Sequence, residues 1–388
     1  MNKYVIDEST LVAIGDAVRE KDGTTEGIKV NELANRILAI PAGGGGGYDI
    51  PDEAFSFSGD CQYTVSGSTW NWFIESYGDK ITTSNITSTK NMFYSNKGLD
   101  SIPFDINISP TCKDMAQMFY QSELRTVPLI KGKLTAPTGT YSGILNIGDM
   151  FAYCRYLREI PHDYFWNFGD EAFWAASENY NGDRGGVFSD CNSLRKLPDI
   201  SMFKTADSQY NALYNNLGQR CYTLDEVINI PVITKKAYTS NAFSYFCNYA
   251  SRVKNITFET NADGSPIVVQ WKNQTIDLTT KVGYLINDSY VTEYNSGLTT
   301  ATRITDDVTY AELKDNEDSW TCNIGYSRYN HDSAVATINS LPDSSAYGTN
   351  TIKFEGAAGA LTDGGAINTL TEAEIAIAAA KGWTVTLV

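Results

Sequence analysis

The chain has 388 residues, 42% of them apolar, and a formal net charge of −16. This apolar content is typical of a folded protein, and a chain of this length can bury a large core. So negative a charge disfavours binding to nucleic acid or to anionic lipid, because both repel acidic surfaces. No apolar run approaches the roughly 18 residues of a membrane helix. The polar beginning, MNKYVIDEST, predicts no secretory signal peptide.

Two helical patterns open the chain, because apolar residues recur at helical spacing in both halves of residues 9–40. Helices this short are marginal alone. We therefore expect residues 1–42 to form a helical hairpin that docks on a particle or forms an oligomer. Residues 43–47 are five consecutive glycines and behave as a flexible linker, so the hairpin is a separate module.

One pattern recurs through the middle of the chain: a Phe, a Cys three residues on, a Leu three further, and an aliphatic residue three further that precedes Pro. It is complete in Phe151–Pro161 and Phe188–Pro198, and weaker units lie on both sides at intervals of 25 to 37 residues. Asn96 and Gln121 replace Cys in the first two units, and Ala250 replaces Leu in the last. The residues assigned to the repeat are Leu99, Leu124, Cys154, Leu157, Cys191, Leu194, Cys221, Leu224 and Cys247.

The repeat predicts a stacked architecture, because no single unit can bury its own apolar face. We expect the Phe and Cys on a short helix or turn, and the aliphatic residue at the start of a strand that pairs with its neighbours. Free Cys is among the most buried residue types, so the Cys positions should form a buried ladder. The odd total of seven cysteines disfavours complete disulfide pairing, and no zinc-ligand spacing occurs. No metal or cofactor is predicted.

The fold class expected from these patterns is an α/β solenoid, preceded by the helical hairpin on its glycine linker. Residues 48–90, with strand-like alternation and clustered aromatics, should cap the array at its beginning. Residues 91–260 should form the solenoid. Residues 261–388 should hold an irregular insertion and capping repeats at the carboxyl end.

The end of the chain gives the clearest local signals. Thr371–Glu374 is a capping box that predicts the start of a helix, and Gly382 predicts its end. Trp383–Val388 and Thr351–Glu355 read as strands, and Ser333–Leu341 as a short helix. The two strands suit terminal units of the stack.

The repeat over residues 88–260 resembles the BspA-like branch of leucine-rich-repeat proteins. Residues 9–40 resemble the amino-terminal segment of tail-associated proteins from phages of Gram-positive bacteria, and Gly348–Val388 resembles the carboxyl ends of such proteins. The resemblance implies a leucine-rich-repeat solenoid with a binding role. It also implies a location in the virion, in the phage tail, after synthesis in the bacterial cytoplasm.

The longest insertion between units, from His162 to Gly186, places aromatic residues among Asp, Glu, Asn and Gly. Insertions in solenoids often lie on the binding face, and aromatic rings beside hydrogen-bonding groups suit a saccharide or a protein epitope. The alternative is that these rings pack beneath the loop or against a sister subunit. The candidate receptor-binding residues are Tyr164, Trp166, Trp174 and Tyr180.

These features predict a phage tail structural protein that binds a glycan or protein of the host cell surface as a receptor-binding protein. It should form a homo-oligomer and contact other tail proteins through residues 1–42, with neither nucleic-acid binding nor membrane insertion. A bacterial cell-surface adhesin is the alternative. A tail-associated glycan hydrolase is a second one, for which Asp170 with Glu171, or Glu178 with Asp183, would supply the carboxylates. No nucleophile motif is present, and we predict no enzymatic activity.

Overall fold

The computed structural model describes nine longer segments and several short pieces of the chain. The longer segments are residues 55–65, 68–134, 145–165, 186–200, 217–224, 253–268, 271–278, 329–354 and 370–387. The short pieces are residues 174–175, 227–230, 250, 284–286, 289–291, 302–303, 311–312 and 321–323. The predicted hairpin at 1–42, the linker at 43–47 and Cys247 lie outside the described residues.

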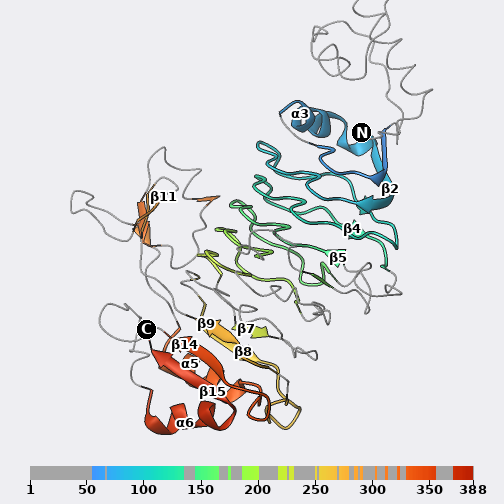
Figure 1. Ribbon diagram of the computed structural model, residues 1–388. Helices are drawn as coiled ribbons and strands as arrows, with labels where there is room; N and C mark the ends of the chain where they lie inside the picture. Colours follow the sequence, from blue (N-terminus) through green and yellow to red (C-terminus); the bar gives the residue numbers. More distant parts are fainter. Residues whose placement is uncertain are drawn as a thin grey trace, which may run out of the picture.

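The described part begins with a parallel pair, β1 (Phe55–Asp60) and β2 (Ile81–Ser88), joined through helix α3 (Ser68–Tyr77) and the 3-10 turn η1 (Gly78–Lys80). Every second residue at the start of each strand is buried, as expected for strands with one covered face. The ring of Phe73 on α3 packs edge-on against Phe55 with centroids 4.7 Å apart. Figure 1 shows α3 at the amino-terminal end of the stacked chain, so its aromatic side covers that end.

Beyond β2, successive passes of the chain lie one on the next, joined by short parallel strand pairs (Figure 1). The pairs are β3 (Ile106–Asn107) with β4 (Ile130–Lys131), β5 (Leu145–Asn146) with β6 (Trp174–Ala175), and β7 (Val227–Ile230) with β8 (Asn255–Phe258). Isolated parallel bridges join further passes. Buried and less buried residues alternate along these strands, as buried Ile130 and exposed Lys131 do in β4, so each strand buries one face against the continuous apolar core.

The carboxyl-terminal region is a parallel sheet in the order β15-β14-β9, formed by β9 (Thr275–Asp277), β14 (Asn350–Phe354) and β15 (Trp383–Leu387). Helices α5 (His331–Ser340) and α6 (Glu372–Ala380) pack against each other there. The predicted capping box is confirmed, because the Thr371 side chain accepts from the Glu374 N–H and the Glu374 side chain accepts from the Thr371 N–H.

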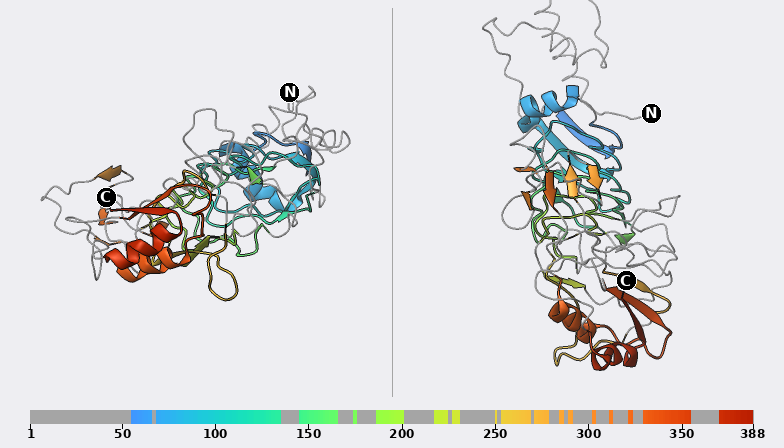
Figure 2. Two further views of the ribbon diagram at one scale, coloured as in Figure 1. Left: turned by 60° about the horizontal axis from the view of Figure 1, so that its bottom comes forward. Right: turned by 90° about the vertical axis from the view of Figure 1, so that its left-hand side faces the viewer.

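A separate four-stranded sheet, in the order β11-β10-β13-β12, stands off one side of the stack (Figures 1 and 2). Its strands are β10 (Tyr284–Ile286), β11 (Ser289–Val291), β12 (Thr302–Arg303) and β13 (Thr321–Asn323). Residues of this insertion reach the stack, since the Ala311 N–H donates to Ser193 Oγ at 2.9 Å. Glu312 also forms an ion pair with Arg158 at 3.8 Å.

Candidate binding surface

The stack is held together by its backbone in five equivalent segments, each of which we call a rung. The rungs are residues 91–99, 117–124, 149–157, 187–194 and 217–224. In the first rung every second N–H donates to the next rung: Asn91 to Ala116 O, Phe93 to Met118 O and Ser95 to Tyr120 O, at 2.7–3.0 Å. The N–H groups between them bond within the rung, as Tyr94 does to Asn91 O. This pairing satisfies the buried backbone and fixes the register of neighbouring rungs.

The Phe of a rung lies in a tight turn, and the Cys directly follows that turn and closes it, since the Cys154 N–H donates to Phe151 O at 3.0 Å. A residue with positive φ recurs at the same two places in successive rungs. Before the Phe position these residues are Asn91, Gln117 and Asp149, and after it they are Ser95, Gln121, Tyr153, Asp190 and Arg220, with φ between 50° and 63°. Repeating this uncommon conformation in register requires support from the neighbouring rungs, which the hydrogen bonds supply.

The Phe side chains form a continuous inner stack. Phe93 lies on Phe119, Phe119 on Phe151, and Phe151 on Phe188, with centroids 5.2–5.9 Å apart and ring planes within 12° of parallel. All four are fully buried. Aromatic pairs of this kind add about 0.5–1.5 kcal/mol each beyond the burial of their area.

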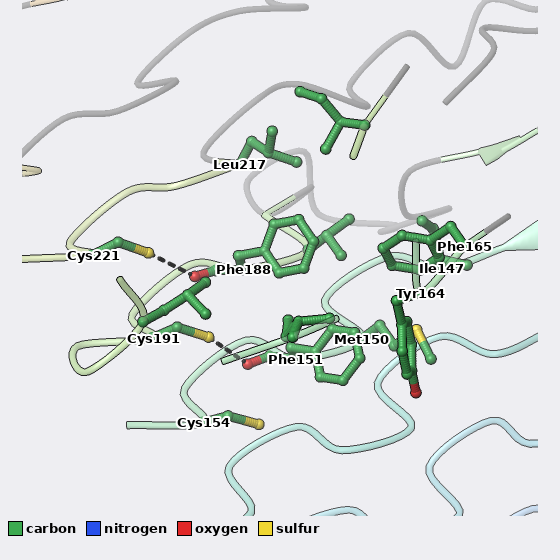
Figure 3. Close-up of a cluster of buried hydrophobic side chains, with 14 of the residues drawn as sticks. Ile147, Met150, Phe151, Cys154, Tyr164, Phe165, Phe188, Cys191, Leu217 and Cys221 are labelled. Atoms are coloured by element: carbon green, nitrogen blue, oxygen red, sulfur yellow. Dashed lines mark hydrogen bonds between the residues drawn. The ribbon is translucent and has the colours of Figure 1, made fainter. Parts of the chain in front are cut away.

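The Cys side chains form a second inner row beside the Phe rings (Figure 3). Cys154 Sγ donates to the carbonyl of Phe119 at 2.9 Å, and the thiols of Cys191 and Cys221 likewise donate to the Phe carbonyl of the preceding rung at 3.1 Å. Burial raises the pKa of the Cys154 thiol to about 12. These thiols therefore stay protonated and act as structural donors.

The second rung corrects the alignment read from the sequence. Ser122, and not Gln121, occupies the Cys position: its N–H donates to Phe119 O and its Oγ lies 3.4 Å from Cys154 Sγ. Gln121 is exposed and adopts the positive-φ conformation of Tyr153 in the next rung. The segment between Phe119 and Leu124 is one residue shorter than in the other rungs, so spacing counted back from Leu placed the wrong residue.

The described residues assigned to the repeat all lie in the core. They are Leu99, Leu124, Cys154, Leu157, Cys191, Leu194, Cys221 and Leu224, none more than 2% exposed. Ala250 is also fully buried.

Of the four candidate receptor-binding residues, the structure describes the side chain of one, Tyr164, and the backbone of a second, Trp174. Tyr164 is 1% exposed, and its hydroxyl donates to Pro128 O at 2.9 Å. Its ring packs edge-on against Phe151, so Tyr164 belongs to the core and offers no surface to a receptor. The backbone of Trp174 lies in β6 beside β5. Trp166 and Tyr180, like the four carboxylates considered for glycan hydrolysis, fall outside the described residues.

A row of four tyrosines runs across successive passes of the stack, and we call it the tyrosine row: Tyr63, Tyr94, Tyr120 and Tyr153. Tyr94 and Tyr120 stack at 5.0 Å with their planes 11° apart. Tyr63 contacts Tyr94 at 6.4 Å, tilted by 58°, and Tyr153 contacts Tyr120 at 5.3 Å, tilted by 60°. Tyr63 is 54% exposed, Tyr94 and Tyr153 are half-buried, and Tyr120 is 9% exposed.

Side-chain interactions also join neighbouring rungs near their surface. Ser95 Oγ donates to Gln121 Oε1 at 2.9 Å, joining the first and second rungs at the surface. Glu123 accepts from the N–H of Gly98 at 2.9 Å, and the Arg125 guanidinium lies 5.7 Å from the centre of the Tyr156 ring. Ser95 and Gln121 directly follow Tyr94 and Tyr120, so their hydrogen bond lies next to that stacked pair.

The sequence holds a partial signal for the tyrosine row. Phe93-Tyr94 and Phe119-Tyr120 repeat the same pair of residues, which indicates that both tyrosines occupy one place of the repeat. Tyr63 and Tyr153 occupy the two positive-φ places instead, Tyr63 the place of Asn91 before the Phe and Tyr153 the place of Gln121 after it, and only the three-dimensional register brings them into line.

No group of three or more His, Cys, Asp or Glu residues suited to a metal ion occurs among the described residues. His331 lies between two carboxylates, with Nδ1 at 3.2 Å from Asp332 and Nε2 at 3.3 Å from Glu374, and thereby ties α5 to α6. These hydrogen bonds, that to Asp332 first, raise the His331 pKa. Within the described ranges, none of the helices has the length and apolar character needed to cross a membrane.

Comparison with known proteins gives no relative. The chain matches no protein-family model, no curated protein and no solved structure.

Proposed function

We propose that this protein is a phage tail structural protein that binds the host cell surface through a leucine-rich-repeat solenoid. The observation that carries the binding role is the tyrosine row, four aromatic side chains held in line by a hydrogen-bonded backbone. A surface held rigid before binding loses little conformational freedom on contact, which favours affinity. Solenoid proteins commonly bind through extended surfaces of this kind.

The tail setting rests on the resemblance of residues 9–40 and Gly348–Val388 to phage tail proteins. In the proposal, residues 1–42 attach the protein to other tail proteins as an oligomer, and the glycine run at 43–47 lets the repeat domain reorient toward the host surface. Attachment needs several weak contacts at once, and an oligomer supplies them by raising the effective concentration of each site. No catalytic step belongs to the proposal.

The test has two arms. Fluorescently labelled full-length protein should bind host cells saturably and release no sugar from purified host wall polysaccharide. Mass spectrometry of purified particles should find the chain in the virion. Sugar release would overturn the non-catalytic role in favour of a glycan hydrolase, and recovery in the bacterial cell-wall fraction without particles would favour an adhesin.

A further inference from the structure

We propose that two copies of this chain pair with each other through the outer edge of strand β15, antiparallel and about a two-fold axis at Thr386. The carboxyl-terminal sheet of one copy then continues into that of the other. This contact is separate from the oligomerisation expected at residues 1–42, and it does not depend on host binding.

The last unit of the stack packs on the preceding unit by one side only. Helix α6 packs on α5, and β15 pairs with β14 along its five residues. The other edge of β15 pairs with no strand in the part of the chain that the structure describes. Figure 1 shows α6 at the end of the stack opposite to α3. The outer side of this unit is therefore the surface at which the array stops.

The backbone of β15 determines which groups face that outer edge. The Gly382 carbonyl faces β14, since it accepts from the Asn350 N–H at 2.9 Å. Backbone groups alternate in direction along a strand, so those of Val385 and Leu387 face away from β14. Trp383 faces the same way but is 1% exposed, so the accessible part of the edge begins after it.

A two-fold axis at Thr386 matches these outward groups. Val385 of one copy then lies opposite Leu387 of the other, and each N–H meets a carbonyl, as in an antiparallel hydrogen-bonded pair. Thr386 lies opposite Thr386 of the second copy as a non-hydrogen-bonded pair, with Cα atoms about 4.5 Å apart. A second copy therefore supplies a strand edge that complements this one.

Strand β15 lacks the features by which proteins protect an edge strand from pairing, which are bulges, prolines and charges. β1, at the other end of the stack, has register shifts between Ser58 and Asp60 and ends on an acidic residue. β15 keeps one register throughout, and its sequence, WTVTL, is uncharged. A contact between β15 and β1 of the next copy would build an open fibre, whereas the two-fold pair closes.

The side chains at this end also suit a second copy. Leu387 is 40% exposed, and Ile377 on α6 is 38% exposed. Ile377 belongs to an exposed apolar stripe at helical spacing, formed with Ala373, Ala376 and Ala380. Pairing about the two-fold axis keeps both α6 helices on the same face of the joined sheet, so that each stripe lies toward the other copy.

Charge favours this end over the rest of the surface. Between Ile375 and Leu387 the only charged residue is Lys381, whose ammonium donates to the α5 carbonyls of Ile338 and Asn339 at 3.0 and 2.6 Å. The whole chain carries a net charge of −16, so two copies repel each other where acidic residues face outward. An end without outward acidic groups between these residues is where two copies approach at the lowest electrostatic cost.

Cysteine cross-linking of the full-length chain tests the register. Thr386→Cys should give a disulfide-linked dimer on mild oxidation, because its Cα atoms would lie within the range of about 4.4–6.8 Å that a disulfide spans. Thr384→Cys is the matched control, since the two copies of this residue would lie more than about 13 Å apart along the strands. The wild type is the second control, because its described free cysteines are buried.

Hydrogen exchange on the wild-type chain tests the same edge without a substitution. Dilution separates a dimer by mass action, so the amides of Val385 and Leu387 should exchange about tenfold faster in dilute than in concentrated protein. Equal cross-linking of both Cys variants, or cross-linking of neither, overturns the inference. Protection that is the same at every concentration also overturns it, because a segment of the same chain would then cover the edge. Rapid exchange at every concentration, or protection only after another tail protein is added, overturns it as well.

Discussion

Phe151→Ala is the most direct test of the stacked core. The Phe151 ring is fully buried, lies between Phe119 at 5.2 Å and Phe188 at 5.9 Å, and meets Tyr164 edge-on at 5.9 Å. Truncating a buried Phe to Ala costs about 3–5 kcal/mol. Because three ring contacts are lost at once, we expect the free energy of unfolding to fall by about 4 kcal/mol. That is a large share of the roughly 5–15 kcal/mol by which a folded protein is typically stable.

Phe151→Leu separates ring contact from volume. Leu fills most of the space but cannot stack, so we expect a loss of about 1–2 kcal/mol. Equilibrium unfolding in urea, followed by tryptophan fluorescence, measures both values. Tyr347→Ala, at a site 38% exposed, should change stability by no more than about 0.5 kcal/mol. A Phe151→Ala protein within about 1 kcal/mol of wild type would refute a continuous Phe stack.

Three further outcomes follow from the structure. Because burial raises the pKa of Cys154 to about 12, this thiol should resist alkylation at pH 8 in the native state and react in denaturant, as read by peptide mass spectrometry; native labelling would contradict its burial. Gly382→Ala should lower the melting temperature through a loss of more than about 1 kcal/mol, because φ is +80° and the new Cβ would lie 2.9 Å from Ser345 Cα; an unchanged melting temperature would show that the turn adapts. The raised His331 pKa means that its bonds to Asp332 and Glu374 add stability below its unfolded pKa of about 6.5, and that this stability is lost as pH rises through the folded pKa. His331→Gln should therefore lower the melting temperature more at pH 5.5 than at pH 9. An equal loss at both pH values would show that protonation of His331 does not contribute to stability.

Local signals in the sequence predicted local structure well. The capping box at Thr371 and the close of α6 before Gly382 needed only neighbouring residues, and both are present. The helix predicted at Ser333–Leu341 begins two residues earlier, at His331, because Asn330 caps it by accepting from the Ser333 N–H. Helix ends depend on such short-range hydrogen bonds, which a sequence displays directly.

Register between rungs was harder to predict. Counting back from Leu124 selected Gln121, whereas the hydrogen bonds between rungs count from Phe119 and put Ser122 inside. Tyr164 looked like part of an exposed aromatic loop, but its hydroxyl bonds a carbonyl 36 residues earlier, and that contact carries it into the core. Neither the position of Ser122 nor that of Tyr164 can be predicted from the residues adjacent to it in the sequence.

The sequence by itself determined which side chains face inward, because the spacing of Phe, Cys and Leu repeats along the chain and apolar groups must leave water. The tertiary structure alone decided which tyrosines meet. Tyr63, Tyr94, Tyr120 and Tyr153 lie far apart along the chain and at three different positions of the repeat, and they form a row only because hydrogen bonds between rungs set the register. Contacts between rungs depend on the length of the intervening loops and on backbone pairing, which no local pattern encodes.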